Sequence, residues 1–127
     1  MTFVDANVFM YAVGRPHPLR DEAESFFIEQ AESGGLLVTS AEVLQELLHA
    51  YVPVGRIDTL DAALALATSR TRRVWAIEPA DVLIARSLIR SFPALRARDL
   101  LHLACCRRHG VTRIKTYDRA LAAAFTV

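Results

Sequence analysis

The sequence predicts an α/β fold in which a mainly parallel sheet lies between layers of helices. Short apolar segments of strand length alternate along the chain with longer amphipathic segments of helix length. Each short segment is followed by at least one helix, as expected for parallel strands joined by helical crossovers. The chain has 127 residues, 53% of them hydrophobic, which suits one core and not two. We therefore expect a single domain over residues 1–127.

The first half of the chain is expected to contain two strands, each followed by two helices. Asn7 and Ser40 are residue types that cap helix N-termini, and Gly34 is suited to the left-handed residue that ends a helix. Acidic residues in the first turn of the second helix suit its dipole. The expected elements are Thr2–Val4, Val8–Val13, Pro18 or Leu19 to about Glu32, Leu36–Thr39, Ala41–Val52 and Ile57–Ser69.

The second half repeats the alternation of strands and helices. Pro93 ends one helix, and Gly110 follows the next where a terminal glycine belongs. The helix that begins at Asp99 is almost wholly apolar, so we expect it to be central and its neighbours Cys105 and Cys106 to be core thiols, not a disulfide. The expected elements are Val74–Ile77, Ala80–Ser91, Asp99–His109, Arg113–Lys115 and Arg119–Ala124, with Thr126–Val127 starting one more strand.

Composition excludes several classes of protein. A formal net charge of +1 argues against a bulk-basic nucleic-acid coat, although the basic residues are fourteen arginines and one lysine, and arginine suits bidentate phosphate contacts. No apolar run approaches the roughly 20 residues that span a bilayer. Asp5 and Asn7 interrupt the first apolar segment, so we expect no signal peptide and a cytoplasmic protein. No cysteine–histidine spacing of a zinc site occurs.

Four carboxylates are expected at one edge of the sheet. Asp5 directly follows the first strand, and Asp118 follows the fourth by three residues. Asp99 begins the central helix, and Glu46 lies on the helix after the second strand. Sites in open α/β sheets form beyond the carboxyl ends of the strands, which is where these positions converge. The alternative is that the three aspartates are helix caps and that the glutamate is solvated.

Glu46 can be separated from Glu42, which lies on the same helix. At about 100° per residue, Glu46 lies roughly 60° from Val43, at the margin of an apolar stripe. The stripe consists of Val43, Leu44, Leu47, Leu48 and Tyr51. Glu42 lies almost opposite the centre of that stripe. We therefore expect Glu46 to lean into a crevice and Glu42 to point to water.

A group of carboxylates in one crevice predicts a divalent cation. Without a cation the acids would repel one another and some would protonate. Mg²⁺ and Mn²⁺ favour carboxylate and water ligands, and such an ion can acidify a bound water and stabilise charge on a phosphate. The four histidines are scattered along the chain and are not expected to be catalytic. His102 follows Asp99 by three residues, so a local hydrogen bond between them is expected.

These residues lie in four motifs that together resemble the PIN-domain family of ribonucleases. The motifs are FVDANVFMYA from residue 3, SAEVLQELLHAY from residue 40, RDLLHLA from residue 98 and IKTYDRAL from residue 114. Their acids are Asp5, Glu46, Asp99 and Asp118. The resemblance covers the whole chain in order, and it implies a PIN-like three-layer sandwich with a central, mainly parallel sheet flanked by helices.

The resemblance also implies roles for the acids. In that family the acids bind Mg²⁺ or Mn²⁺, and a metal-activated water cuts RNA. Asp5 and Asp99 would be the central ligands, Glu46 would bind the ion or position the water, and Asp118 would complete the shell. Asn7 and Thr116 would orient these groups. Asn7 stands where many members carry Ser or Thr.

Stand-alone family members of this size are mostly VapC toxins. The resemblance therefore also implies partners. These are an RNA substrate, a second copy of the chain in a homodimer, and a VapB-like antitoxin whose tail inserts near the acids. The apolar surplus and the negative crevice also favour a partner, because an arginine side chain matches paired carboxylates. The helices on either side of Gly34-Gly35 offer apolar faces for a partner helix.

Three other functions were weighed against the ribonuclease. A haloacid-dehalogenase-like phosphatase needs a second aspartate two residues after Asp5, where this chain has Asn7. A receiver domain needs an acceptor aspartate after a middle strand, and residues 40–57 contain none. The third is a PIN-like binding module without activity, against which the retention of all four acids argues.

Overall fold

A four-stranded parallel sheet lies at the centre of the molecule. The computed structural model describes residues 1–126, and Val127 lies outside the described part. The strands pair in the order β3-β2-β1-β4, and every neighbouring pair is parallel. They are β1 Thr2–Val4, β2 Leu37–Ser40, β3 Arg73–Trp75 and β4 Arg113–Lys115.

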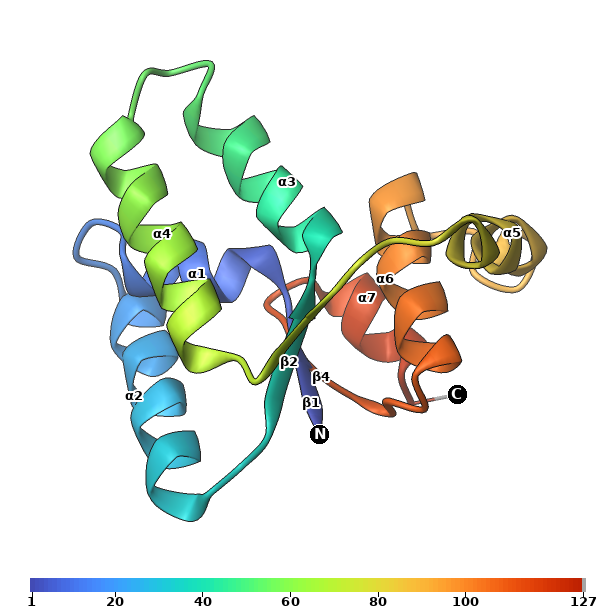
Figure 1. The fold of residues 1–127 in the computed structure, drawn as a ribbon, viewed down its shortest axis with the longest axis horizontal. Coiled ribbons are helices and arrows are strands. Elements are labelled where there is room, and N and C mark those ends of the chain that lie inside the picture. Colours follow the sequence, from blue (N-terminus) through green and yellow to red (C-terminus); the bar gives the residue numbers. More distant parts are fainter. Residues whose placement is uncertain (127) are drawn as a thin grey trace.

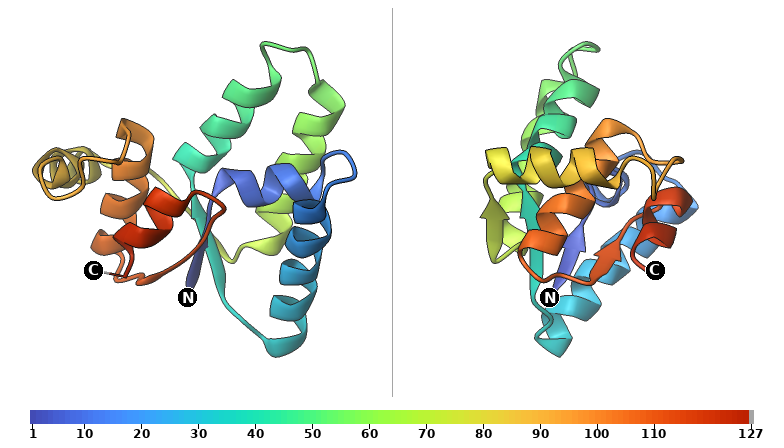
Figure 2. Two further views of the ribbon diagram at one scale, coloured as in Figure 1. Left: turned by 180° about the vertical axis from the view of Figure 1, so that it is seen from behind. Right: turned by 90° about the vertical axis from the view of Figure 1, so that its right-hand side faces the viewer.

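Helices cover both faces of the sheet, so the fold has three layers (Figure 1). One layer contains α1 Ala6–Ala12, α2 Pro18–Ser33, α3 Ala41–Tyr51 and α4 Ile57–Arg70. The other layer contains α5 Pro79–Leu88, α6 Ala97–Arg108 and α7 Arg119–Ala124. The left view in Figure 2 shows the same division from behind, and the right view shows the layer of α5, α6 and α7 in front of the strands. The predicted fold class, a mainly parallel sheet flanked by helices, is confirmed.

Apolar side chains fill the space on each side of the sheet. Phe3 on β1, Phe9 on α1 and Leu47 on α3 are fully buried in the larger cluster, which the first helical layer forms against the sheet. Leu103 and its neighbours on α6 form a smaller cluster with α5 and α7. The two cysteines of α6 are buried as free thiols, as predicted. No helix within residues 1–126 is long and apolar enough to cross a bilayer.

The strand register brings distant residues to one edge of the sheet. Val4 pairs with Lys115 where β1 and β4 end together, and the Asp5 amide donates to the Lys115 carbonyl at 3.0 Å. On the other side of β1, the Thr39 hydroxyl donates to the Val4 carbonyl at 2.9 Å. The residues that follow these strands therefore share the carboxyl edge, where binding sites of such sheets form.

Two predicted helix starts were wrong. Helix α1 begins at Ala6 and ends at Ala12, because Asp5 and not Asn7 caps it: Asp5 is extended and accepts from the Ala6 amide. Helix α6 begins at Ala97, two residues earlier than predicted. Asp99 therefore lies in its first turn, where the side chain accepts from the Arg96 amide at 3.2 Å.

Two further ends differ in the second half of the chain. Strand β3 ends at Trp75, because its partner β2 ends at Ser40, whose hydroxyl accepts from Val43 at the start of α3. Helix α5 ends at Leu88, where the Leu88 carbonyl accepts from the amides of the following turn. The strand predicted to start at Thr126–Val127 falls on Val127, which lies outside the described residues.

Candidate metal centre

Asp5 is the most deeply buried acid of the crevice. Its side chain follows β1 and is 6% exposed. One carboxylate oxygen accepts from the Ala6 amide at 2.8 Å and the other from the Thr116 hydroxyl at 2.7 Å. Burial raises the pKa of Asp5, and the charge of Glu46 raises it further; His102 and the two hydrogen bonds oppose this without cancelling it. A buried acid with a raised pKa would gain from a nearby cation.

The Thr116 hydroxyl, just after β4, holds the carboxylate of Asp5, and Asn7 on α1 holds Thr116. The Thr116 hydroxyl also accepts from the Asn7 side-chain amide at 3.2 Å and from the Asp118 backbone amide at 3.1 Å. The Asn7 carbonyl oxygen in turn accepts from the Tyr117 amide at 3.2 Å. This network crosses from the end of β1 to the end of β4, and it places both residues where the sequence predicted supporting groups.

Glu46 and His102 meet beside Asp5. The Nε2 atom of His102 lies 3.0 Å from a Glu46 oxygen and 3.6 Å from an Asp5 oxygen. One donor atom from each of the three side chains lies within 4.8 Å of the others. Burial lowers the pKa of His102, but its hydrogen bond to Glu46 and the nearby negative charges raise it more, so the pKa lies above its ordinary value.

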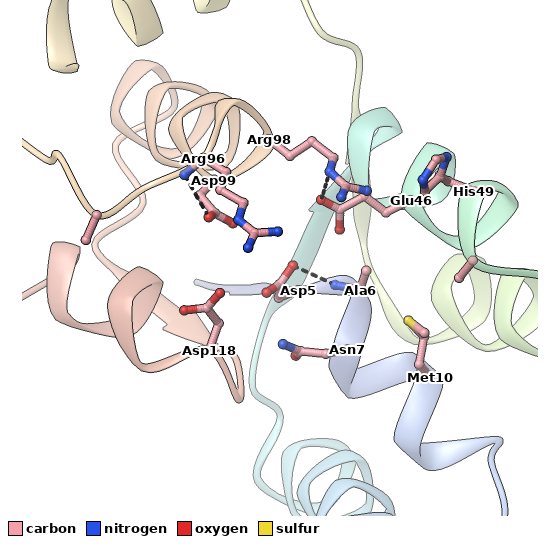
Figure 3. Close-up of a pocket in the computed structure, with 12 residues that line it drawn as sticks. Asp5, Ala6, Asn7, Met10, Glu46, His49, Arg96, Arg98, Asp99 and Asp118 are labelled. Carbon is pink, nitrogen blue, oxygen red and sulfur yellow. Dashed lines mark hydrogen bonds and ion pairs between the residues drawn. The ribbon is translucent and has the colours of Figure 1, made fainter.

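Asp99 and Asp118 line the same crevice at greater distance from this cluster. The crevice encloses about 640 Å³ at the carboxyl edge, between α3 on one side and α6 on the other. In Figure 3 Asp5 lies at its floor, with Asp118 and Asp99 on the side opposite Glu46. Asp118 accepts from the Leu121 amide at 3.1 Å and so caps α7.

Two arginines of the third motif region also face the crevice. Arg96 and Arg98 line it, and the Nε atom of Arg98 lies 3.8 Å from a Glu46 oxygen. Figure 3 shows both guanidinium groups directed toward the acids. Arg98 is 44% exposed, so its ion pair with Glu46 is screened and weak.

The structure therefore brings all four predicted acids to one crevice. The capping alternative is also correct for Asp5 and Asp118, which shows that a cap and a crevice position do not exclude each other. Sequence reasoning missed that His102 joins the cluster: its hydrogen bond is made to Glu46 on α3, not to Asp99. The signal was present, because a residue three positions after Asp99 lies on the same face of the helix.

The prediction that Glu42 points to water was wrong. Its side chain is half-buried, and burial raises its pKa, modulated by the charges of His102, Glu46 and Arg98. The apolar stripe of α3 was drawn too wide, because Leu48 is 46% exposed and so lies outside the buried face. Leaving out Leu48 shifts the centre of the stripe by only about 17°, so periodicity alone does not explain the burial of Glu42. The charges of His102 and Arg98 act on Glu42, which indicates that α6 lies close to this part of α3.

The donor set at the crevice fits a divalent cation. Carboxylates are the ligands that Mg²⁺ and Mn²⁺ favour, and Mn²⁺ also accepts imidazole nitrogen. The nearby charge of Glu46 raises the pKa of Asp5, and a bound cation would offset that repulsion. The structure thus contains an acidic site that can hold a metal, formed by Asp5, Glu46 and His102 with Asp99 and Asp118 nearby.

A three-layer α/β domain with an acidic site at the carboxyl edge of a parallel sheet is an arrangement that can hold a divalent cation beside a phosphate. The chain belongs to the PIN domain family, whose sequence pattern it matches over residues 2–125. Among its relatives are the ribonucleases VapC23 and VapC13 of Mycobacterium tuberculosis. The identities are 62% over 98% of both chains for VapC23, and 41% over 94% of this chain and 91% of the other for VapC13.

A solved structure shows the same fold. The crystal structure of VapC20 from Mycobacterium tuberculosis, described as a toxin that cleaves the sarcin–ricin loop, superposes with a TM-score of 0.81. The match covers 98% of this chain and 95% of that one at 18% sequence identity. It supports the fold, and the sequence relatives place the chain with the VapC branch of the family.

Proposed function

We propose that this chain is a metal-dependent endoribonuclease of a single domain, the toxin of a VapBC-type toxin–antitoxin pair. The observation that carries the proposal is the convergence of Asp5 and Glu46 on one buried point of the crevice. Asp5, Glu46, Asp99 and Asp118 would hold Mg²⁺ or Mn²⁺. The VapC ribonucleases to which the chain is similar support the choice of RNA as substrate.

Each side chain around the crevice has a role in this proposal. Thr116 holds the Asp5 carboxylate by a direct hydrogen bond, and Asn7 supports it by donating to the Thr116 hydroxyl. Arg96 and Arg98 line the crevice and would hold the RNA backbone, a contact that carries no base sequence information. When bound, the cation would supply an acidified water as nucleophile and would stabilise charge on the phosphate.

We propose two protein partners, a VapB-like antitoxin and a second copy of the chain, and a place in the cytoplasm with its RNA substrate. Support for the partners comes from apolar side chains that remain exposed. Ile28 on α2 and Leu48 on α3 are 53% and 46% exposed, on the helices that flank Gly34-Gly35. Val82 and Leu83 on α5 are 52% and 71% exposed. Such patches on small proteins commonly mark interfaces.

The test is RNA cleavage by the purified protein with Mg²⁺, with Mn²⁺ and with EDTA. We expect cleavage with either ion and none with EDTA. Asp5→Asn should be inactive, whereas Asp61→Asn, a change of the same kind on the exposed side of α4, should cut normally. Full cleavage in EDTA would contradict the metal mechanism.

Two further measurements separate the alternatives. A folded protein that binds RNA but cuts none with either ion would be a binding module. Release of inorganic phosphate from a phosphomonoester, with RNA left intact, would indicate a phosphatase. For the toxin assignment, expression of the chain alone should arrest growth, and co-expression with the gene product encoded beside it should restore growth.

A further inference from the structure

A second hollow lies beside the acidic crevice and shares part of its wall. It encloses about 730 Å³ and shares Asn7 and Met10 of α1 with the crevice. Both side chains are labelled on α1 in Figure 3. Tyr11 lies four residues, about 6 Å along the helix axis, beyond Asn7 and lines the second hollow but not the crevice. A chain that leaves the crevice along α1 therefore enters this hollow within a short distance.

Aromatic rings form part of the wall of the second hollow. The rings of Tyr11 and His17 lie 5.1 Å apart between centroids, and Tyr11 is braced by an edge-on contact with Tyr117 at 5.4 Å. Tyr51 lines the hollow from α3. His17 is held in place because its Nδ1 atom caps α2 by accepting from the Leu19 amide at 3.0 Å. Flat rings held by such contacts are surfaces on which a base can stack.

The charge of the second hollow is opposite to that of the crevice. Arg15 and Arg56 line it, and none of its lining residues is an aspartate or glutamate. Both arginines are exposed, and neither forms an ion pair with any carboxylate among residues 1–126. Arg56 lies over the Tyr51 ring at 6.0 Å and donates to the Thr59 hydroxyl at 3.3 Å. These guanidinium groups are therefore free to meet phosphate oxygens.

We infer that the second hollow binds a nucleotide of the RNA strand that flanks the cleaved phosphate, with its base on Tyr11 and His17 and its phosphate on Arg15 and Arg56. The inference rests on the proposed ribonuclease function and extends it to a substrate subsite. Rings beside unpaired cations suit an unstacked nucleotide, because bases stack on aromatic faces and the backbone follows positive charge. An apolar partner helix would need neither guanidinium group.

Arginine variants test the phosphate contacts. The ligand is a short fluorescein-labelled single-stranded RNA of mixed sequence, bound in EDTA so that it stays intact and followed by anisotropy. We expect Arg15→Gln with Arg56→Gln to weaken binding about tenfold at moderate salt and to lower the salt slope by about one for each arginine. In cleavage with Mn²⁺ the KM should rise and kcat should change little. Arg90→Gln is the control, because Arg90 is exposed and lines neither hollow.

Tyrosine variants test the stacking surface. Tyr11→Leu keeps an apolar side chain but removes the ring, and we expect it to weaken RNA binding about tenfold. Tyr11→Phe keeps the ring and should bind as the unchanged protein does. Thermal melting shows whether Tyr11→Leu is folded; if it is not, the exposed arginine pair decides the question alone.

The outcomes separate the subsite from the proposed function. If the unchanged protein cuts RNA while the arginine pair binds and cuts it as Arg90→Gln does, the subsite is refuted and the ribonuclease stands. If the arginine pair cuts normally but escapes inhibition by the antitoxin, the hollow is a protein-binding site and the inference is wrong. If the unchanged protein neither binds nor cuts RNA with any ion, the proposed function fails, and the inference fails with it.

Discussion

The Nε2 atom of His102 lies 3.0 Å from a carboxylate oxygen of Glu46, and this contact joins α6 to α3 from the opposite layer of the fold. His102 is fully buried and packs its ring against Phe3 at 5.4 Å. Its Nδ1 atom has no hydrogen-bond partner among residues 1–126. The negative charges of Glu46 and Asp5 favour the protonated form of this imidazole and raise the pKa of His102, so a cation bound beside these acids would compete with that proton.

We predict that the metal-free protein is less stable at alkaline than at mildly acidic pH. The pKa of His102 is raised in the folded state, so its stabilising contribution is complete below the ordinary histidine pKa of about 6.5 and is lost as pH rises through the folded pKa. The raised pKa of Asp5 likewise makes the folded protein less stable as pH rises, because the ionised form of Asp5 is disfavoured in the folded state. Melting temperatures measured in EDTA between about pH 6 and pH 9 check this.

The control for this prediction is His102→Gln, which can still donate to Glu46 but does not titrate. We expect its melting temperature to vary less with pH over the same range. An equally steep pH dependence in His102→Gln would mean that another group is responsible.

Glu46→Gln should abolish RNA cleavage and leave the fold intact. The substitution keeps the shape of the side chain and removes one charge from beside Asp5. We expect activity to fall by more than the roughly 10–100-fold that losing an outer-shell partner costs. At about pH 8, where His102 is less protonated, the melting temperature of the metal-free protein should stay the same or rise slightly, because repulsion between the acids is eased.

Two other glutamates make this comparison quantitative. Glu29→Gln, exposed on α2, should leave activity and stability nearly unchanged, as exposed substitutions usually do. The effect of Glu42→Gln on activity should be smaller than that of Glu46→Gln and larger than that of Glu29→Gln. Glu42 is half-buried, and the charges of His102 and Glu46 act on its carboxylate. Equal activity of the Glu46 and Glu29 variants at saturating Mg²⁺ would remove Glu46 from the site, which would then rest on Asp5, Asp99 and Asp118.

The alternation of strands and helices, and the acids that follow them, were predictable from the sequence because they depend on local pattern. Asp5 and Asp118 were placed correctly since the carboxyl ends of parallel strands meet at one edge whatever the register. Helix periodicity distinguished Glu46 from Glu42, and the four motifs added the family. Strand ends were less predictable: β3 stops at Trp75 because its partner stops, a tertiary effect.

Contacts between layers were not predictable from helix periodicity. His102 contacts Glu46 because α6 and α3 approach each other across the end of the sheet. A helical-wheel projection of one helix does not show which residues of the other helix it will contact. The error at Glu42 has the same origin. Leu48 was counted as core from its residue type, although no layer covers it in the structure.

Asp81→Asn should destabilise the protein without impairing the crevice. Asp81 is fully buried on α5 and accepts from Arg108 of α6 at 2.5 Å and from the Glu78 amide at 2.8 Å. Removing its charge leaves the Arg108 guanidinium without its partner, so we expect the melting temperature to fall by several degrees. Cleavage per folded molecule should be unchanged at low temperature, because Asp81 does not line the crevice.

The same pair predicts how the protein responds to acid. Burial raises the pKa of Asp81, but the bonds from Arg108 and Glu78 lower it more, so the pKa lies below its ordinary value. The stabilisation is therefore complete above the unfolded pKa of about 3.9 and is lost as pH falls through the folded value. Below the folded pKa of Asp81, the Asp81→Asn variant and the unchanged protein should have similar free energies of unfolding. A constant difference down to about pH 2 would contradict this account.

Thr116→Val should weaken the metal site without touching any acid. Valine keeps the shape of threonine but removes the hydroxyl that donates to Asp5 and accepts from Asn7 and from the Asp118 amide. Losing these bonds should cost about 1–3 kcal/mol of stability and lower Mn²⁺ affinity and cleavage by roughly 10–100-fold. Calorimetric titration with Mn²⁺ measures the affinity independently of catalysis. Thr116→Ser keeps the hydroxyl and should recover most of the Mn²⁺ affinity and most of the cleavage activity. Equal Mn²⁺ affinity in the Val and Ser variants would show that the hydroxyl does not position Asp5.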